Sequence, residues 1–88
     1  MKIKLLKHLK EQAKERDIDI KLIKEILSNP EQIAPEINGL KIAQKICHID
    51  NKQYLIRAIF REKKDLIIGI TVYKTSKIKK YWKNENKI

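Results

Sequence analysis

The sequence has little cysteine, glycine, proline or tryptophan: its 88 residues include one Cys, two Gly, two Pro and one Trp. The single cysteine, Cys47, cannot form an internal disulfide, and no group of His and Cys residues has the spacing of metal ligands. A disulfide scaffold and a zinc module are therefore excluded. We expect a fold that rests on packing alone and a function that needs no metal or other cofactor.

Long apolar runs are absent as well. No stretch is long enough to span a bilayer, and lysines interrupt the apolar residues of the N-terminal M-K-I-K-L-L-K-H before the core of a signal peptide could form. We therefore expect a soluble, cytoplasmic protein with no membrane partner. The length predicts one small domain, residues 1–88, with a single modest core.

Positive charge, by contrast, is abundant and unevenly distributed. The formal net charge is +10, and residues 63–88 carry +6 of it. Such a localised excess favours binding to a polyanion over a uniformly solvated surface. However, eighteen lysines against three arginines, together with seventeen isoleucines, are also what an AT-rich coding bias produces. The charge by itself therefore leaves a plain structural domain open.

Two helices are predicted in the first part of the chain. An amphipathic helix over residues 5–16 is indicated by apolar residues three and four positions apart, namely Leu5, Leu6, Leu9 and Ala13. Residues 1–4 fit a short edge strand. Asp19 is a suitable N-cap for a second helix over 20–27, which the following Asn-Pro pair ends. Residues 30–38 are then expected to form a loop that crosses to a β half.

In the second part of the chain, apolar residues alternate with period two and predict three strands, at 40–49, 53–61 and 66–73. We expect three-residue hairpin loops at 50–52 and 63–65. Matching the apolar faces opposes Ile42–Phe60, Ile46–Ile56, Ile56–Val72, Ala58–Ile70 and Phe60–Ile68. The predicted fold class is α+β, with two N-terminal helices packed on one face of a three- to four-stranded antiparallel sheet.

The predicted register gives the other face of the sheet a basic character. Its polar and charged residues are, row by row, Lys45, Arg57 and Thr71, then Tyr73, and beyond them Lys41 and Arg61. Like charges placed opposite one another are mildly destabilising, and an anion would relieve them. Gly69 would leave a shallow depression on this face next to Arg57. We favour a binding face, with a solvated outer face as the alternative.

The segment after the last strand combines cations with aromatic rings. Lys74, Lys77, Lys79, Lys80 and Lys83 are interleaved with Tyr73, Tyr81 and Trp82. This composition pairs charges for a phosphate backbone with rings that stack on bases. Residues 76–82 form either a last turn of helix or a mobile tail, and Trp82 either caps the small core or stacks on a base.

The chemistry that these residues could support is narrow. No Gly-rich phosphate loop, Walker motif, pair of catalytic carboxylates or Ser-His-Asp order is present, so hydrolases of those types are not expected. The remaining cations and hydroxyls suit metal-free cleavage of RNA, in which the 2′-OH attacks the adjacent phosphate. His8 or Tyr73 would transfer protons, and Arg57 with a lysine would hold the phosphate. The candidate catalytic residues are therefore His8, Arg57 and Tyr73.

The candidate RNA-binding residues come from both parts of the chain: Arg16, Lys41, Lys45, Arg61, Thr71, Lys74, Lys77, Lys79, Lys80 and Tyr81. Arg16 falls near the middle of the apolar stripe of the first predicted helix, so it needs a partner there. In the alternative interpretation Arg16 only ends the helix, where a cation suits the helix dipole.

Several of these segments, in this order, resemble a known family. The segment H-L-K-E-Q-A-K-E-R-D-I-D, a helix ending in S-N-P, a strand hairpin and the segment I-T-V-Y-K-T-S-K-I-K-K-Y-W are similar to a family of short bacterial proteins of uncharacterised function. That family is placed in the RelE/ParE-like toxin superfamily, near the BrnT-type toxins. Its pattern has His-Ala, arginines four and eight residues after the His, and a Val-Thr-Val-Tyr strand followed by basic residues. The motif positions are occupied here by His8, Arg16, Thr71 and Tyr73.

This chain departs from the family pattern at two positions. Gln12 stands where the first arginine is usual, and Asp17 stands where a glycine usually follows the second arginine. The resemblance nevertheless implies a RelE-like fold and the toxin of a type II toxin–antitoxin pair. Such a toxin would be an endoribonuclease that cleaves mRNA at the ribosome.

The resemblance also implies a cognate small antitoxin as a partner. An exposed basic face predicts that this antitoxin has an acidic or amphipathic segment that folds on binding. A second hypothesis keeps the fold without the chemistry: the basic face binds nucleic acid or gyrase, as ParE-like relatives would, and Gln12 indicates that catalysis is not required. A third is a plain structural or partner-binding domain.

Overall fold

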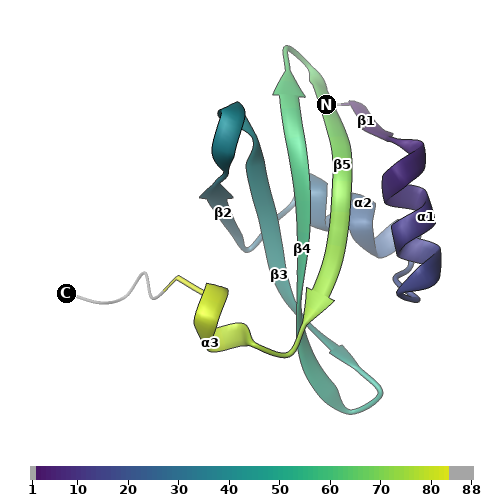
Figure 1. Ribbon diagram of the computed structural model, residues 1–88, viewed down its shortest axis with the longest axis vertical. Coiled ribbons are helices and arrows are strands. Elements are labelled where there is room, and N and C mark those ends of the chain that lie inside the picture. Colours follow the sequence, from purple (N-terminus) through teal and green to yellow (C-terminus); the bar gives the residue numbers. More distant parts are fainter. Residues whose placement is uncertain (1, 84–88) are drawn as a thin grey trace.

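Three long strands form the centre of the structure, which is a computed structural model that describes residues 2–83. The elements along the chain are β1 (Lys2–Leu5), α1 (Lys7–Glu15), α2 (Ile20–Ser28), β2 (Gln32–Pro35), the 3-10 turn η1 (Ile37–Gly39), β3 (Lys41–Ile49), β4 (Lys52–Lys63), β5 (Leu66–Thr75) and α3 (Ile78–Tyr81) (Figure 1). Within residues 2–83, every helix is too short or too polar to cross a membrane.

The strands join in one mixed sheet with the order β1-β5-β4-β3-β2. β1 runs parallel to β5, and the other neighbours are antiparallel. The α+β class is confirmed, and so is the short edge strand near the N-terminus. In place of three or four antiparallel strands, the sheet has five strands with one parallel pair. Residues 30–38, predicted as a loop, contain β2, which forms because residues 32–35 pair with β3, and the first two residues of η1.

The two N-terminal helices pack on the sheet as predicted. Figure 1 shows α2 behind the sheet and α1 beside β5. Asp19 caps α2, since its side chain accepts a hydrogen bond from the backbone nitrogen of Lys21 at 2.9 Å. Together the helices bury the main core, which includes Leu9, Ala13, Ile23, Ile26, Leu27, Ile56, Ala58 and Val72. This core holds one face of β4 and β5 against the helices.

The β3–β4 hairpin has a shorter loop than predicted. Asp50 and Asn51 both adopt left-handed backbone conformations, with φ of 51° and 66°, and Ile49 lies opposite Lys52. A two-residue turn of this kind matches the twist of the flanking strands. The register is therefore shifted by one residue, and the predicted pairs Ile42–Phe60 and Ile46–Ile56 are wrong.

The β4–β5 hairpin differs from the prediction in two ways. Its loop has two residues rather than three, since Lys63 lies opposite Leu66. A β-bulge between Ile59 and Phe60 then leaves Ile70 of β5 without an opposite residue. The predicted pairs Ile56–Val72, Ala58–Ile70 and Phe60–Ile68 are therefore wrong.

The bulge also changes which residues of β5 face the helices. The predicted pairs put Ile68, Ile70 and Val72 on the helix side, whereas Ile67 and Val72 belong to the helix-side core. Gly69, predicted to leave a depression next to Arg57, faces the helices as well. A Cβ atom at Gly69 would lie 2.9 Å from Leu5 Cδ2 and 3.0 Å from Leu9 Cδ1. The missing side chain thus permits close helix packing, and the predicted depression is wrong.

Substitution Gly69→Ala should destabilise the fold, because the added methyl group overlaps two leucine side chains. We expect the free energy of unfolding to fall by about 1–3 kcal/mol, the usual effect of overpacking. Urea unfolding followed by circular dichroism measures this change. In a Leu9→Ala background the same substitution should cost less, because space has been opened beside it. Equal costs in both backgrounds would contradict the packing role.

Candidate functional site

Four polar side chains form a row across the sheet face opposite α2, which we call the second face. Gln32 of β2 pairs with Gln44 of β3, Gln44 with Arg57 of β4, and Arg57 with Tyr73 of β5. Residues opposite one another in neighbouring strands point to the same face of a sheet. The register alone therefore places these four residues, the polar cluster, side by side.

Hydrogen bonds connect the whole polar cluster. Arg57 Nε donates to Gln44 Oε1 at 2.9 Å, and Arg57 Nη1 donates to the Tyr73 hydroxyl at 2.5 Å. Gln44 Nε2 donates to Gln32 Oε1 at 2.8 Å. Gln44 is 0% exposed and Arg57 is 8% exposed, so these bonds are largely shielded from water. They fix the plane of the guanidinium.

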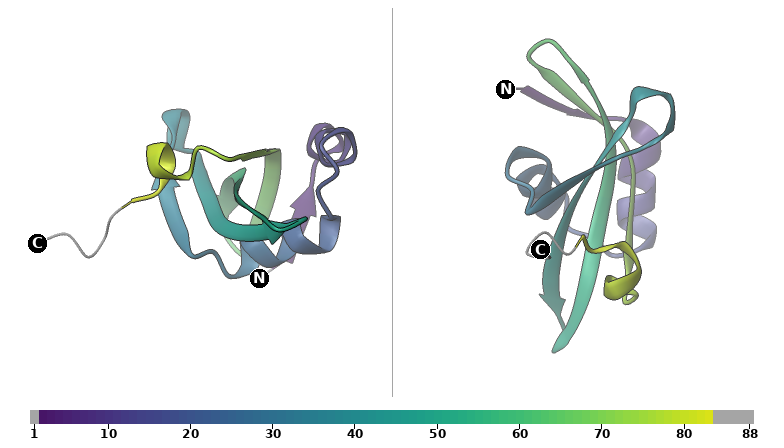
Figure 2. Two further views of the ribbon diagram at one scale, coloured as in Figure 1. Left: turned by 90° about the horizontal axis from the view of Figure 1, so that it is seen from below. Right: turned by 90° about the vertical axis from the view of Figure 1, so that its left-hand side faces the viewer.

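Residues 76–83, the C-terminal segment, cover the polar cluster. The ring centroid of Tyr81 lies 4.2 Å from Arg57 Cζ, in a cation–π contact. Gln44 Nε2 donates to the Tyr81 carbonyl at 3.2 Å, and Gln32 Nε2 donates to the Lys83 carbonyl at 2.7 Å. Figure 2 shows α3 and α2 on opposite sides of the sheet. Of the two alternatives for residues 76–82, the structure has the turn of helix, α3, with Trp82 half-buried after it.

Arg57 is a nearly buried cation without a carboxylate partner among residues 2–83. The two ion pairs in this part of the chain join Lys41 to Glu62 and Lys45 to Glu25. Nε and Nη1 of Arg57 have acceptors, whereas Nη2 has none there. Among residues 2–83, Nη2 is therefore the guanidinium nitrogen without an acceptor. A guanidinium edge of this kind is one that can donate to an anion.

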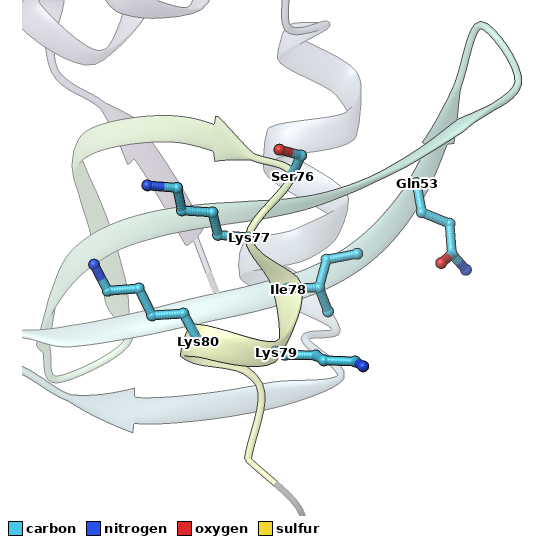
Figure 3. A pocket seen from close by; sticks show the side chains of 6 residues that line it. All are labelled: Gln53, Ser76, Lys77, Ile78, Lys79 and Lys80. Carbon is cyan, nitrogen blue, oxygen red and sulfur yellow. The ribbon is translucent and has the colours of Figure 1, made fainter.

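The C-terminal segment adds further cations, and Lys80 Nζ lies 5.3 Å from the ring centroid of Tyr81, which covers Arg57. The segment forms an open pocket of about 530 Å³ with Gln53 of β4, lined by Gln53, Ser76, Lys77, Ile78, Lys79 and Lys80. Figure 3 shows Lys77 and Lys80 pointing to the same side of α3 and Lys79 to the opposite side. Two ammonium groups on one side suit an extended anion better than a single point charge.

The residues predicted on the first helix do not join this site. His8 is exposed on α1, in a shallow depression lined only by α1 residues. Arg16 Nη1 donates to the Val72 carbonyl at 2.6 Å, and Gln12 Oε1 accepts from the Val72 backbone nitrogen at 3.0 Å. The pairing of β5 with β1 ends at Gly69, so β1 offers no partner to the backbone of Val72. The two side chains supply those hydrogen bonds instead. The partner that Arg16 needs is therefore the backbone of β5.

Two of the predicted RNA-binding lysines have acidic partners. Lys45 Nζ lies 3.1 Å from Glu25 Oε1 of α2, and this hydrogen bond raises the pKa of Lys45. Lys41 Nζ lies 3.3 Å from Glu62 Oε1. The prediction that Lys45 shares a row with Arg57 is wrong, because the one-residue shift turns Lys45 to the helix side.

The remaining predicted residues are divided between the two faces. Thr71 is on the second face, one row from Tyr73, and Arg61 is exposed further along β4. Lys74 lies opposite helix-facing Ile56, with Nζ 5.2 Å from the ring centroid of Tyr54. Cys47 packs against the helix-side core, where burial raises the pKa of its thiol. The predicted basic face is thus smaller and centred on Arg57.

Sequence reasoning missed the two glutamines of the polar cluster. Gln44 lies between Ile42 and Ile46 in β3, and all three point to the same face. A polar amide between apolar residues on one face of a strand could have indicated a buried polar site, since such a group is buried only with hydrogen-bond partners. Gln32 had no comparable signal, because residues 30–38 had been predicted as a loop.

The described residues offer no obvious metal site, since residues 2–83 hold no group of three His, Cys, Asp or Glu side chains placed to bind an ion. Comparison of the chain with protein-family models, with curated proteins and with solved structures finds no match. Function must therefore be argued from the polar cluster and its surroundings.

Substitution Gln44→Leu should destabilise the fold, because it removes hydrogen-bond partners of both Arg57 Nε and Gln32 Oε1. The free energy of unfolding should fall by about 1–3 kcal/mol or more, as expected when buried polar groups lose partners. Gln53→Leu, at an exposed position of β4, is the matched control and should change stability by less than about 0.5 kcal/mol. Chemical denaturation of both variants measures the difference. Similar stabilities would contradict a structural role for the buried amide.

Proposed function

We propose that this chain is the toxin of a toxin–antitoxin pair and cleaves RNA at Arg57 and Tyr73 without a metal ion. The observation that carries this proposal is a nearly buried arginine that has no carboxylate partner among residues 2–83 and is hydrogen-bonded to a tyrosine hydroxyl. Lys80 of the C-terminal segment lies next to the Tyr81 ring that covers this arginine. A phosphodiester supplies the negative charge that this cluster of cations lacks.

In the proposed reaction, each residue of the site has a separate role. Arg57 stabilises the charge that gathers on the phosphate as the 2′-OH attacks, with Nη2 as the free donor. The Tyr73 hydroxyl accepts from Arg57 Nη1, so its own hydrogen is directed to another acceptor. The attack forms a 2′,3′-cyclic phosphate and breaks the bond to the 5′-oxygen of the next nucleotide. We assign Tyr73 to donate its hydroxyl proton to this leaving oxygen, while water takes the proton of the 2′-OH and the lysines of the C-terminal segment bind the neighbouring phosphates. His8 has no role in this scheme.

Two features of the backbone support the toxin assignment. The segments that carry the resemblance to RelE/ParE-like proteins contact each other directly, because Gln12 and Arg16 bind the backbone of Val72. Asp17 has φ of 55°, a conformation that favours glycine, and glycine is usual there in the family. Gln12 keeps a contact to β5, so the absence of the family arginine leaves the helix anchored. A RelE-like fold and an antitoxin partner are part of the proposal.

A second candidate function is binding of nucleic acid, or of a target such as gyrase, without cleavage. One observation favours it: the structure does not bring His8 to Arg57, so the second face has a single tyrosine and lysines as proton-transfer groups. In this version Arg57 and the lysines hold phosphates, and inhibition follows from binding alone.

Substitution Tyr73→Phe separates these candidates. If Tyr73 transfers a proton, RNA cleavage should fall by about 100- to 10,000-fold while RNA affinity changes little. Mapping of RNA ends after expression in bacteria, and cleavage of a labelled RNA by purified protein, measure the effect. His8→Ala is the control and should cleave like the parent. Loss of cleavage in His8→Ala but not in Tyr73→Phe would contradict the assignment, and binding without cleavage by the parent would favour the second candidate.

The double substitution Lys77→Ala with Lys80→Ala should lower the affinity for RNA and make that affinity less dependent on salt concentration. Both lysines project from one side of α3 (Figure 3). Each phosphate contact to single-stranded RNA contributes about 0.7 to the slope of log K against log salt concentration, so the slope should fall by about 1.4. The control with equal charge loss is Lys21→Ala with Lys24→Ala on exposed positions of α2. Equal slopes for both double variants would contradict a localised RNA-binding face.

A further inference from the structure

The C-terminal segment contacts the polar cluster in a way that imitates a nucleotide. The Tyr81 ring stacks over the guanidinium of Arg57, at 4.2 Å from its centroid to Cζ. Arginine planes stack on nucleobases in the same manner as on aromatic side chains. The position that the ring occupies is therefore one that a base can occupy.

The contact between Gln32 and Lys83 has the form of a base-edge contact. The carboxamide of Gln32 donates from Nε2 to the Lys83 carbonyl at 2.7 Å and accepts at Oε1 from the Lys83 nitrogen at 3.0 Å. It thus engages an adjacent acceptor and donor at the same time. Glutamine side chains pair in this bidentate way with the edges of nucleobases, which also carry an acceptor next to a donor.

Polar contacts of Tyr81 and Lys83, rather than buried apolar side chains, hold the C-terminal segment on the sheet. α3 consists of four residues, none of which is buried. A single turn of helix has no intrinsic stability, and regions with few buried apolar contacts open at low free energy. The segment also carries Lys77, Lys80 and Lys83, and Lys80 Nζ lies 5.3 Å from the ring centroid of Tyr81, which covers Arg57. The like charges of the segment and of Arg57 repel each other, which favours exchange of the segment for a polyanion.

Opening of the segment without a replacement is nevertheless unfavourable. It would remove the acceptor of Gln32 Nε2, one acceptor of Gln44 Nε2 and the ring over Arg57. Buried amides that lose their partners must find others. A ligand that offers a flat ring, an adjacent donor and acceptor, and negative charge replaces all of these contacts together.

From these contacts we propose that residues 81–83 occupy a nucleotide subsite, which an RNA base enters by displacing them, stacking on Arg57 and pairing with Gln32. This inference rests on the proposed RNA-binding function and adds the base-recognising residue and the means of access. Tyr81, predicted from the sequence as an RNA contact, is in this account the group that the base replaces.

Trp82 provides a direct test in the full-length protein, because it is the only tryptophan, is half-buried and lies within residues 81–83. Titration with a short single-stranded oligoribonucleotide should shift its emission to longer wavelength as the segment leaves the sheet. Inorganic polyphosphate of equal charge carries no bases, so it should bind to the lysines without this shift. Equal shifts with both ligands, or RNA binding with no shift, would overturn the inference.

Substitution Tyr81→Ala tests the same point by affinity. Removal of the ring weakens the closed arrangement, so RNA affinity should rise by about three- to tenfold, the effect of losing one half-buried cation–π contact. Lys79→Ala, on the opposite side of α3, is the control for a change in the same turn and should show no such rise. A fall in affinity for Tyr81→Ala would show instead that Tyr81 contacts RNA, and would overturn the inference while leaving RNA binding intact. Absence of RNA binding in parent and Tyr81→Ala alike would overturn the proposed function together with it.

Discussion

The arrangement of the second face depends on how the buried guanidinium of Arg57 is satisfied. A nearly buried cation is unfavourable unless hydrogen bonds compensate for the water that it loses. Here one amide, one phenol and one aromatic ring take that role in place of a carboxylate. Among residues 2–83, this arrangement leaves the guanidinium without a carboxylate partner. It also requires Gln32 and the C-terminal segment to complete the hydrogen bonds of Gln44.

The register of the two hairpins is the constraint that brings these groups together. Asp50 and Asn51 form a two-residue turn, and a bulge interrupts β5 at Ile70. With a three-residue loop at 50–52, Lys45 rather than Gln44 would share the row of Arg57, and the two cations would repel each other. The observed register instead gives Arg57 a neutral acceptor and turns Lys45 toward Glu25.

Much of the fold was predictable from local patterns. The three-and-four spacing of apolar residues and the Asp19 cap indicated both long helices, and period-two alternation indicated the three long strands. The register was not predictable in the same way, because β4 is apolar on both faces around Leu55, Ile56 and Ala58. Either register would bury an apolar row, so the turns and the packing of α2 determine which register forms. The β2 strand was missed because only its pairing with β3 defines it.

The sequence by itself determined the α+β class, the helical and strand segments and the excess of positive charge near the C-terminus, and it indicated Arg57 and Tyr73 as candidate residues. Only the tertiary structure decided that these two residues are hydrogen-bonded, that His8 lies apart from them, and that Gln32 and Gln44 complete the row. The physical reason is that local patterns depend on neighbours along the chain. The polar cluster depends instead on contacts between four strands. A shift of one residue in any hairpin would turn one or more of its side chains to the other face of the sheet.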